Sequence, residues 1–85
     1  MRRVLITGGA GFMGSAVVRA FSAAGWDVVV LDKLTYAGRR AFLDGTGAQL
    51  IVGDVCDSSA VDAALVGVNA VIHMAAESQI GRAHV

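Results

Sequence analysis

Four glycines between an apolar run and an amphipathic run constrain this chain more than any other feature. The segment Thr7-Gly8-Gly9-Ala10-Gly11-Phe12-Met13-Gly14 follows Val4-Leu5-Ile6 and leads into a helix-forming stretch. A strand that passes through such a loop into a helix directs several backbone N–H groups and the positive end of the helix dipole at one point. A pyrophosphate suits that point, and larger side chains would block it. The loop therefore predicts an α/β unit with a phosphate-binding turn.

The glycines fit two registers, Gly9-x-Gly11-x-x-Gly14 and Gly8-x-x-Gly11-x-x-Gly14. Both keep Gly11 for close approach of the backbone to a ligand and Gly14 for packing of the helix on the strand. Either register alone is weakly specific. Asp32 adds weight, because dinucleotide-binding units place an acid for the ribose hydroxyls about 20 residues after the glycines. The alternative, a tight turn without a ligand, explains neither Gly14 nor Asp32.

Apolar periodicity predicts the helices and strands. Strands are expected at 3–7, 26–31, 49–53 and 70–73, and helices at 12–24, 59–65 and, more briefly, around 40–43. The first helix is expected to bury Phe12, Ala16, Val17, Ala20, Phe21 and Ala24, and the second to begin at an N-cap of Asp57 or Ser58. Alternation of this kind predicts parallel strands with right-handed crossovers in the order 3-2-1-4, as part of a doubly wound α/β sheet covered on both faces.

Composition narrows the class of partner. Seven basic and seven acidic residues are scattered along the chain, so we expect small-molecule ligands and neither nucleic acid nor a membrane surface. The apolar runs are too short to span a bilayer, and the glycines interrupt any signal-like segment after Arg2-Arg3. Cys56, the single cysteine, is expected to be a free, packed thiol in a reducing cytoplasm.

With the strands placed, several strings resemble a known family. The glycine segment 7–15, Asp54 after the third strand and His73-Met74-Ala75-Ala76 after the fourth resemble the extended short-chain dehydrogenase/reductases that act on nucleotide sugars, with a Rossmann fold. Leu31-Asp32-Lys33-Leu34-Thr35-Tyr36-Ala37-Gly38 and Ala75-Ala76-Glu77-Ser78 are similar to the dTDP-glucose 4,6-dehydratases of the NAD-dependent epimerase/dehydratase family. The resemblance covers residues 1–78, which correspond to the opening part of such an enzyme.

The resemblance implies a set of NAD-binding residues. The pyrophosphate turn comprises Gly8, Gly11, Phe12, Met13 and Gly14, and the adenosine ribose is expected to meet Asp32, Lys33, Leu34 and Thr35. The adenine is expected to lie beside Asp54 and Val55. The nicotinamide half is expected to lie beside Met74, Ala75, Ala76 and Ser78, and Ser78 is also expected near the sugar substrate. Asp32 favours NAD over NADP, because a carboxylate repels a 2′-phosphate. Lys33 favours NADP instead, because a basic side chain attracts the 2′-phosphate. Asp54 has an alternative interpretation, as a residue at the start of the following helix.

No catalytic residue and no metal ligand is assigned. A dehydratase of this kind, as the resemblance implies, oxidises the sugar at C4, eliminates water across C5 and C6 and returns the hydride, using a tyrosine with a lysine and a pair of acid/base side chains. Tyr36, the only tyrosine, stands four residues before Arg40, which imitates the Tyr-x-x-x-Lys spacing of the family's catalytic pair. It follows the second strand, however, and arginine stays charged where the family has a lysine, so the two are not assigned as catalytic residues. His73 is expected to be a packed residue bonded to backbone.

Residues 79–85 depart from the family pattern, which continues His-Val-Asp-Arg-Ser after Glu-Ser. Divergence and a foreign tail both account for Gln79-Ile80-Gly81-Arg82-Ala83-His84-Val85. Reverse translation of 79–85 as CAG ATC GGA AGA GCA CAC GTC contains ATCGGAAGAGCACACGTC, which resembles a common sequencing-adapter string. We therefore expect 79–85 to be a non-native tail and 1–78 to be a partial NAD-binding domain.

The functional expectation is an NAD-binding fragment of an enzyme, a lyase, that converts dTDP-glucose to dTDP-4-keto-6-deoxyglucose. The parent enzyme is expected to be a cytoplasmic homodimer, and the fragment to be inactive and poorly soluble because its fourth strand leaves an unpaired edge. The alternatives are another NAD-dependent nucleotide-sugar epimerase or decarboxylase, and a non-catalytic dinucleotide-sensing module.

Overall fold

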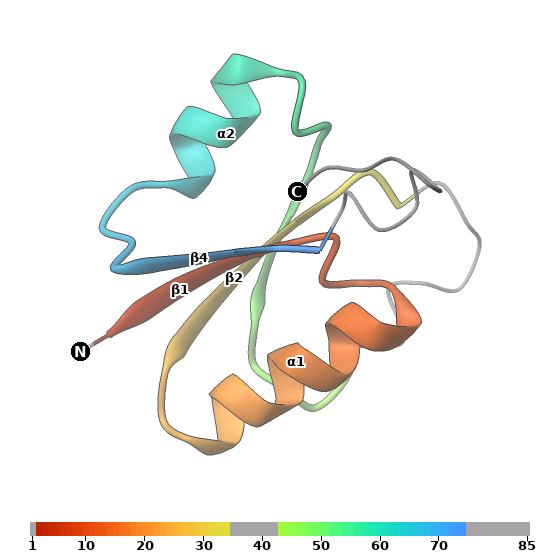
Figure 1. Ribbon diagram of the computed structural model, residues 1–85, viewed down its shortest axis with the longest axis vertical. Helices are drawn as coiled ribbons and strands as arrows, with labels where there is room; N and C mark the ends of the chain where they lie inside the picture. The colour runs from red at the N-terminus through yellow and green to blue at the C-terminus, as the bar shows by residue number, and fades with distance from the viewer. Residues whose placement is uncertain (1, 35–42, 75–85) are drawn as a thin grey trace.

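A computed structural model describes residues 2–34 and 43–74 of this chain. The elements in chain order are β1 (Arg3–Thr7), α1 (Phe12–Ala23), β2 (Asp27–Asp32), β3 (Gln49–Val52), α2 (Ser58–Ala64) and β4 (Ala70–His73). The strands form one parallel sheet in the order β3-β2-β1-β4, and the two helices lie on opposite sides of it (Figure 1). The predicted α/β fold and strand order are confirmed. None of the described helices has the length and apolar character needed to cross a membrane.

β1 lies at the centre of the sheet. Leu5 pairs with Val29 of β2 on one side and with Val71 of β4 on the other. Because the strands are parallel, their carboxyl ends meet at one edge, which we call the carboxyl edge. The glycine-rich loop leaves this edge after β1, Lys33 follows β2, and Met74 follows β4, so the fold gathers the predicted site residues there.

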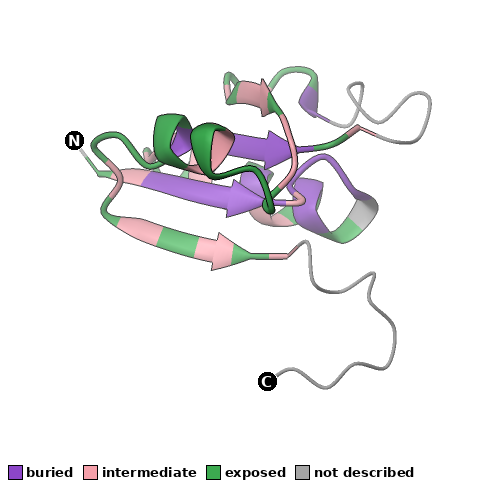
Figure 2. Ribbon diagram, turned by 90° about the horizontal axis from the view of Figure 1, so that it is seen from above, coloured by how far each residue is buried: buried purple, intermediate pink, exposed green. Residues whose placement is uncertain are grey.

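Alternating side chains of the strands build two hydrophobic layers. Val4, Ile6 and Val30 pack with Val18 on the α1 side, whereas Leu5, Val29 and Leu31 pack with Ala64 on the α2 side. Figure 2 shows the consequence, since two central strands are buried along most of their length. Such unbroken apolar runs are typical of parallel strands covered on both faces.

β4 is covered less completely than the sequence predicts. Its residues alternate between intermediate and exposed (Figure 2). Val71 is 53% exposed, on the same face of the sheet as its β1 partner Leu5. The reason is the position of α2, which packs over β2 and β3. Coverage on both faces therefore applies to β1 and β2, and only in part to β4.

The predicted buried face of α1 requires correction. Ala16, Ala20 and Ala24 are exposed, while Val18, which the prediction omitted, is fully buried. Gly14 causes the difference, because it faces inward against the glycine-rich loop and Val18 lies one helical turn later on the same side. Val17 and Phe21 are partly buried against the core, as expected.

Candidate functional site

The glycine-rich loop turns sharply as it leaves β1. Gly8 has a φ of +73°, in the left-handed region that favours glycine. Its N–H donates to the Leu31 carbonyl at 2.8 Å, and the Gly11 N–H donates to the Gly8 carbonyl at 3.2 Å. These bonds tie the loop to the end of β2 and bring the chain back over the sheet as α1 begins.

Two of the glycines are required by contact with neighbouring atoms. A Cβ on Gly14 would lie 2.3 Å from the carbonyl oxygen of Gly8, so the first turn of α1 packs directly on the loop backbone. A Cβ on Gly9 would lie 2.9 Å from a methyl group of Val30. The sequence singled out Gly14 for close packing, but gave Gly9 no role among the binding residues; the contact with Val30 was not visible in the spacing.

The two helices begin differently. Asp57, one of the two predicted N-caps, caps α2. Its carboxylate accepts hydrogen bonds from the N–H groups of Ser59 and Ala60. The N-cap of α1 is Gly11, which makes no side-chain cap bond, and the first turn of α1 contains no acidic residue. The start of α1 thus lacks the side-chain cap that the start of α2 has, which is an arrangement typical of helices that bind an anion.

Asp32 lies at the end of β2 and is 6% exposed. One carboxylate oxygen, Oδ2, accepts the Ala10 N–H at 3.0 Å, and the other, Oδ1, accepts the Leu34 N–H at 2.8 Å. An ionised carboxylate has about four acceptor sites, so two remain for further donors such as ribose hydroxyls. Sequence reasoning missed the bond to Ala10, through which Asp32 supports the glycine-rich loop.

Leu34 adopts an unusual backbone conformation. Its φ is +54°, the only positive value found for a residue other than glycine among the described residues. The N–H bond to Asp32 holds this conformation, and the side chain packs against the α1-side core. A left-handed leucine costs about 1–2 kcal/mol, and such strain is characteristic of functional loops.

Lys33 and Asp54 form an ion pair across the carboxyl ends of β2 and β3. Lys33 Nζ lies 3.6 Å from Asp54 Oδ2, and both side chains are partly exposed. The pKa of the Asp54 carboxyl is lowered, first by the hydrogen bond from the Cys56 N–H and then by the charge of Lys33. Asp54 therefore stays ionised, and its helix-start interpretation is wrong, because Asp57 is the cap.

His73 bonds to a side chain and not to backbone, contrary to expectation. Its Nδ1 lies 2.6 Å from Oγ1 of Thr7, the residue that precedes the glycines. The Met74 N–H donates both to the Thr7 carbonyl at 2.9 Å and to Thr7 Oγ1 at 3.1 Å. His73 is exposed and is the last residue of β4. This network joins the start of the glycine-rich loop to the point where the chain leaves β4.

The described part of the chain thus brings most of the predicted cofactor residues to the carboxyl edge. They are Gly8, Gly11, Phe12, Met13, Gly14, Asp32, Lys33, Leu34, Asp54, Val55 and Met74. Met13 is 60% exposed and Val55 37%, which leaves both apolar side chains available. The predicted residues Thr35, Ala75, Ala76 and Ser78 lie outside the described residues. Cys56 is free as expected, but it is exposed and does not pack in the core.

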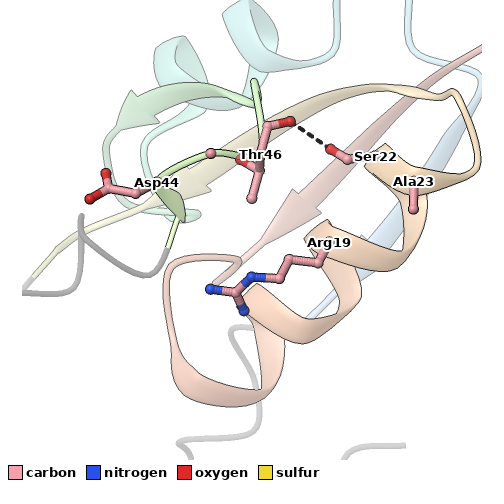
Figure 3. A pocket seen from close by; sticks show the side chains of 6 residues that line it. Arg19, Ser22, Ala23, Asp44 and Thr46 are labelled. Carbon is pink, nitrogen blue, oxygen red and sulfur yellow. Dashed lines mark hydrogen bonds between the residues drawn. The ribbon is translucent and has the colours of Figure 1, made fainter.

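An open pocket of about 370 Å³ lies elsewhere, at the amino ends of β2 and β3. It is lined by Arg19, Ser22, Ala23, Asp44, Gly45 and Thr46 (Figure 3). Ser22 Oγ donates to the Thr46 carbonyl at 2.9 Å across it. Because ligands of open parallel sheets bind at the carboxyl ends of the strands, this pocket is not the candidate site.

Comparison with known sequences agrees with the geometry. The chain matches the model of the NAD dependent epimerase/dehydratase family over residues 4–85. The dTDP-glucose 4,6-dehydratase of Streptomyces niveus is 42% identical over 90 residues, which cover 94% of this chain and 27% of that protein. The dTDP-glucose 4,6-dehydratase 1 of Escherichia coli K12 is 45% identical over 87 residues, with coverages of 94% and 24%. The chain spans about a quarter of the length of these relatives.

Solved structures show the same fold. A dTDP-glucose 4,6-dehydratase from Bacillus anthracis in complex with NAD superposes with a TM-score of 0.77 at 26% identity, covering 93% of this chain and 28% of that one. A UDP-glucose 4-epimerase from Brucella ovis in complex with NAD gives a TM-score of 0.77 at 29% identity, covering 87% of this chain and 22% of that one. Both of these structural neighbours contain NAD, which confirms the expected type of cofactor.

Proposed function

Because this chain belongs to the NAD dependent epimerase/dehydratase family, we propose that it is the NAD-binding opening part of a dTDP-glucose 4,6-dehydratase. The identity to curated dehydratases, 42–45% over nearly the whole chain, supports this choice of enzyme. The conversion of dTDP-glucose to dTDP-4-keto-6-deoxyglucose, and assembly as a homodimer, are proposed for the complete polypeptide. Within this chain, 1–78 is the proposed native NAD-binding part and 79–85 the proposed foreign tail.

One observation carries the cofactor assignment. The start of α1 has no side-chain cap and no acidic residue, and it adjoins a glycine loop held by a buried acid. This arrangement suits a dinucleotide, because backbone N–H groups receive the pyrophosphate while the free acceptor sites of Asp32 face ribose hydroxyls. The residues proposed to hold NAD are those of the carboxyl edge given above, together with Thr35, Ala75, Ala76 and Ser78.

The chemistry is divided between the cofactor and parts of the enzyme beyond this chain. When bound, NAD supplies reversible hydride acceptance at C4 of the sugar. The residues of this chain bind and orient the dinucleotide, and Ser78 is proposed to contact the sugar. The sequence holds one tyrosine, Tyr36, and the residue four positions after it is Arg40 instead of the lysine that the resemblance requires, so we propose that the chain by itself is inactive.

An epimerase is the second candidate. The epimerase from Brucella ovis superposes as well as the dehydratase does, at the same TM-score of 0.77. The curated dehydratases, at 42% and 45% identity, favour the dehydratase, whereas between these two solved structures the epimerase is slightly more identical to this chain, at 29% against 26%. Supplying dTDP-glucose to the complete gene product separates the two, because a dehydratase releases a product lighter by one water and an epimerase releases an isomer of unchanged mass.

Cofactor binding can be tested on this chain directly by NMR of the ¹⁵N-labelled protein. NAD⁺ and ADP should shift the amide signals of Gly11, Met13 and Gly14, whereas nicotinamide mononucleotide, which lacks the adenosine half, should not. The amides of Gly45 and Thr46 at the opposite pocket serve as an internal control and should stay in place. Equal shifts with all three ligands, or no shift at millimolar NAD⁺, would contradict the proposal.

A further inference from the structure

The residue next to the ribose acid carries a positive charge that is already engaged. Lys33 follows Asp32 directly, and its ammonium lies 3.6 Å from Oδ2 of Asp54. The ends of β2 and β3 are fixed side by side, since the Gly53 N–H donates to the Asp32 carbonyl at 3.0 Å. Lys33 and Asp54 therefore meet through the register of the sheet as well as through their charges.

We propose that Asp54 is a specificity-determining residue that keeps Lys33 from binding a 2′-phosphate and so strengthens the preference for NAD over NADP. The inference rests on the proposed cofactor site. It deepens that proposal, because Asp32 alone leaves an adjacent lysine that would favour a 2′-phosphate.

The orientation of the Asp54 side chain supports this role. Its other oxygen, Oδ1, accepts the Cys56 N–H at 2.9 Å, which holds the carboxylate so that Oδ2 faces Lys33. The same N–H bond lowers the pKa of Asp54, so the charge is present at neutral pH. The carboxylate is thus charged and held in place to pair with the lysine.

The expected effect is modest because the pair is partly exposed. The side chains of Lys33 and Asp54 are 58% and 42% exposed, and solvent screens such pairs. We therefore expect a change of about threefold to fivefold in the ratio of the NADP⁺ and NAD⁺ dissociation constants, in line with exposed ion pairs.

The decisive variant is Asp54→Asn, which retains an oxygen for the Cys56 N–H and removes the charge. The dissociation constants of NAD⁺ and NADP⁺ are measured by NMR titration of the 85-residue chain. Any contact of residue 54 with adenine is common to both ligands and cancels in their ratio. The ratio of the NADP⁺ constant to the NAD⁺ constant should fall about threefold to fivefold.

Two further variants isolate the ion pair. Asp57→Asn makes the same charge change near Asp54, and asparagine caps a helix as well as aspartate does, so its ratio should equal that of the unmodified chain. Adding Lys33→Gln to Asp54→Asn should remove the gain in NADP⁺ affinity. An unchanged ratio in Asp54→Asn, or an equal fall in Asp57→Asn, overturns the inference alone. Failure of the unmodified chain to bind NAD⁺ overturns the proposed function and the inference with it.

Discussion

The Asp32 carboxylate accepts the Ala10 N–H at 3.0 Å, so the acid at the end of β2 holds the loop that follows β1. Its second oxygen fixes the Leu34 N–H, and Leu34 is the residue in the left-handed conformation. One buried carboxylate therefore shapes both the loop expected at the pyrophosphate and the loop expected at the adenosine ribose. Substitution of Asp32 is expected to change the empty site as well as its contacts with a ligand.

Asp32→Ala should destabilise the chain by about 2–3 kcal/mol, because it leaves the N–H groups of Ala10 and Leu34 without their acceptor. Urea unfolding, followed by the fluorescence of Trp26, measures the change. Trp26 packs edge-to-face on Phe21 at a centroid distance of 5.1 Å, so its emission reports on core packing. The exposed Asp44→Ala should change the free energy of unfolding by less than about 0.5 kcal/mol. Equal changes in the free energy of unfolding for Asp32→Ala and Asp44→Ala would contradict a structural role of Asp32.

Gly14→Ala should be strongly destabilising, by about 2–4 kcal/mol, although alanine is the better helix former. The reason is steric, since the new Cβ would lie 2.3 Å from the Gly8 carbonyl oxygen. Gly45→Ala is the matched control: Gly45 has a φ of +81° but open space around it, so only conformational strain of about 1 kcal/mol is expected. A tolerated Gly14→Ala in the same unfolding assay would show that α1 can move off the loop.

At position 34, a replacement that is branched at Cβ should destabilise the fold more than an unbranched one. Leu34→Val places a β-branched residue at a φ of +54°, where such residues are rare, and should cost about 1–2 kcal/mol more than Leu34→Met. The difference between their thermal unfolding midpoints gives the measurement. Similar midpoints would indicate that this backbone position relaxes readily to a negative φ.

The bond between Thr7 and His73 predicts the tautomer of the imidazole. Thr7 Oγ1 accepts the Met74 N–H, and Nδ1 of His73 is the one acceptor found for its hydroxyl hydrogen among the described residues, so we expect Thr7 to donate to Nδ1 and Nε2 to carry the ring proton of the neutral imidazole. Ring ¹⁵N shifts at a pH where His73 is neutral should show an unprotonated Nδ1. Thr7→Ser should preserve this pattern and Thr7→Val should lose it. A protonated Nδ1 in the unmodified chain would reverse the assigned direction of the bond.

The Asp54 carboxyl should titrate below its ordinary pKa of 3.8, as followed by the ¹³C shift of the carboxyl carbon. Because the pKa is lowered on folding, the stabilisation is present above the unfolded pKa and is lost as the pH falls through the folded one. Lys33→Gln should raise the pKa only in part, since the Cys56 N–H is the larger cause. Full return to 3.8 in Lys33→Gln would mean that the lysine, and not the amide, sets the shift.

Most of the sheet was predictable, because four short apolar runs bounded by glycines and polar residues leave little choice of topology. Strands β1 and β4 have the predicted bounds, and β2 differs by a shift of one residue. The buried face of α1 was less predictable. Glycine carries no apolar side chain to reveal which way Gly14 faces, so the periodicity of the alanines suggested a face that is in fact exposed.

The residue types of the candidate site were predictable, but their connections were not. Asp32 was identified from its distance in sequence to the glycines, whereas its bond to Ala10 depends on how the loop folds back. Nothing in a leucine signals a positive φ, and the conformation of Leu34 follows from the carboxylate two residues before it. Cys56 looked like a core thiol by composition, yet it lies in the turn made by Asp54.

The central position of β1 also sets the order in which the sheet can be completed during synthesis. Of the four described strands, β1 leaves the ribosome before the others, and its partner on one side, β2, follows soon after it. Its other partner is β4, and the contact between Thr7 and His73 joins residues 66 positions apart in the chain. Until β4 emerges, one edge of β1 stays unpaired, which exposes the nascent chain to association with other chains. The same long-range pairing makes the final step of folding slow compared with the formation of either helix.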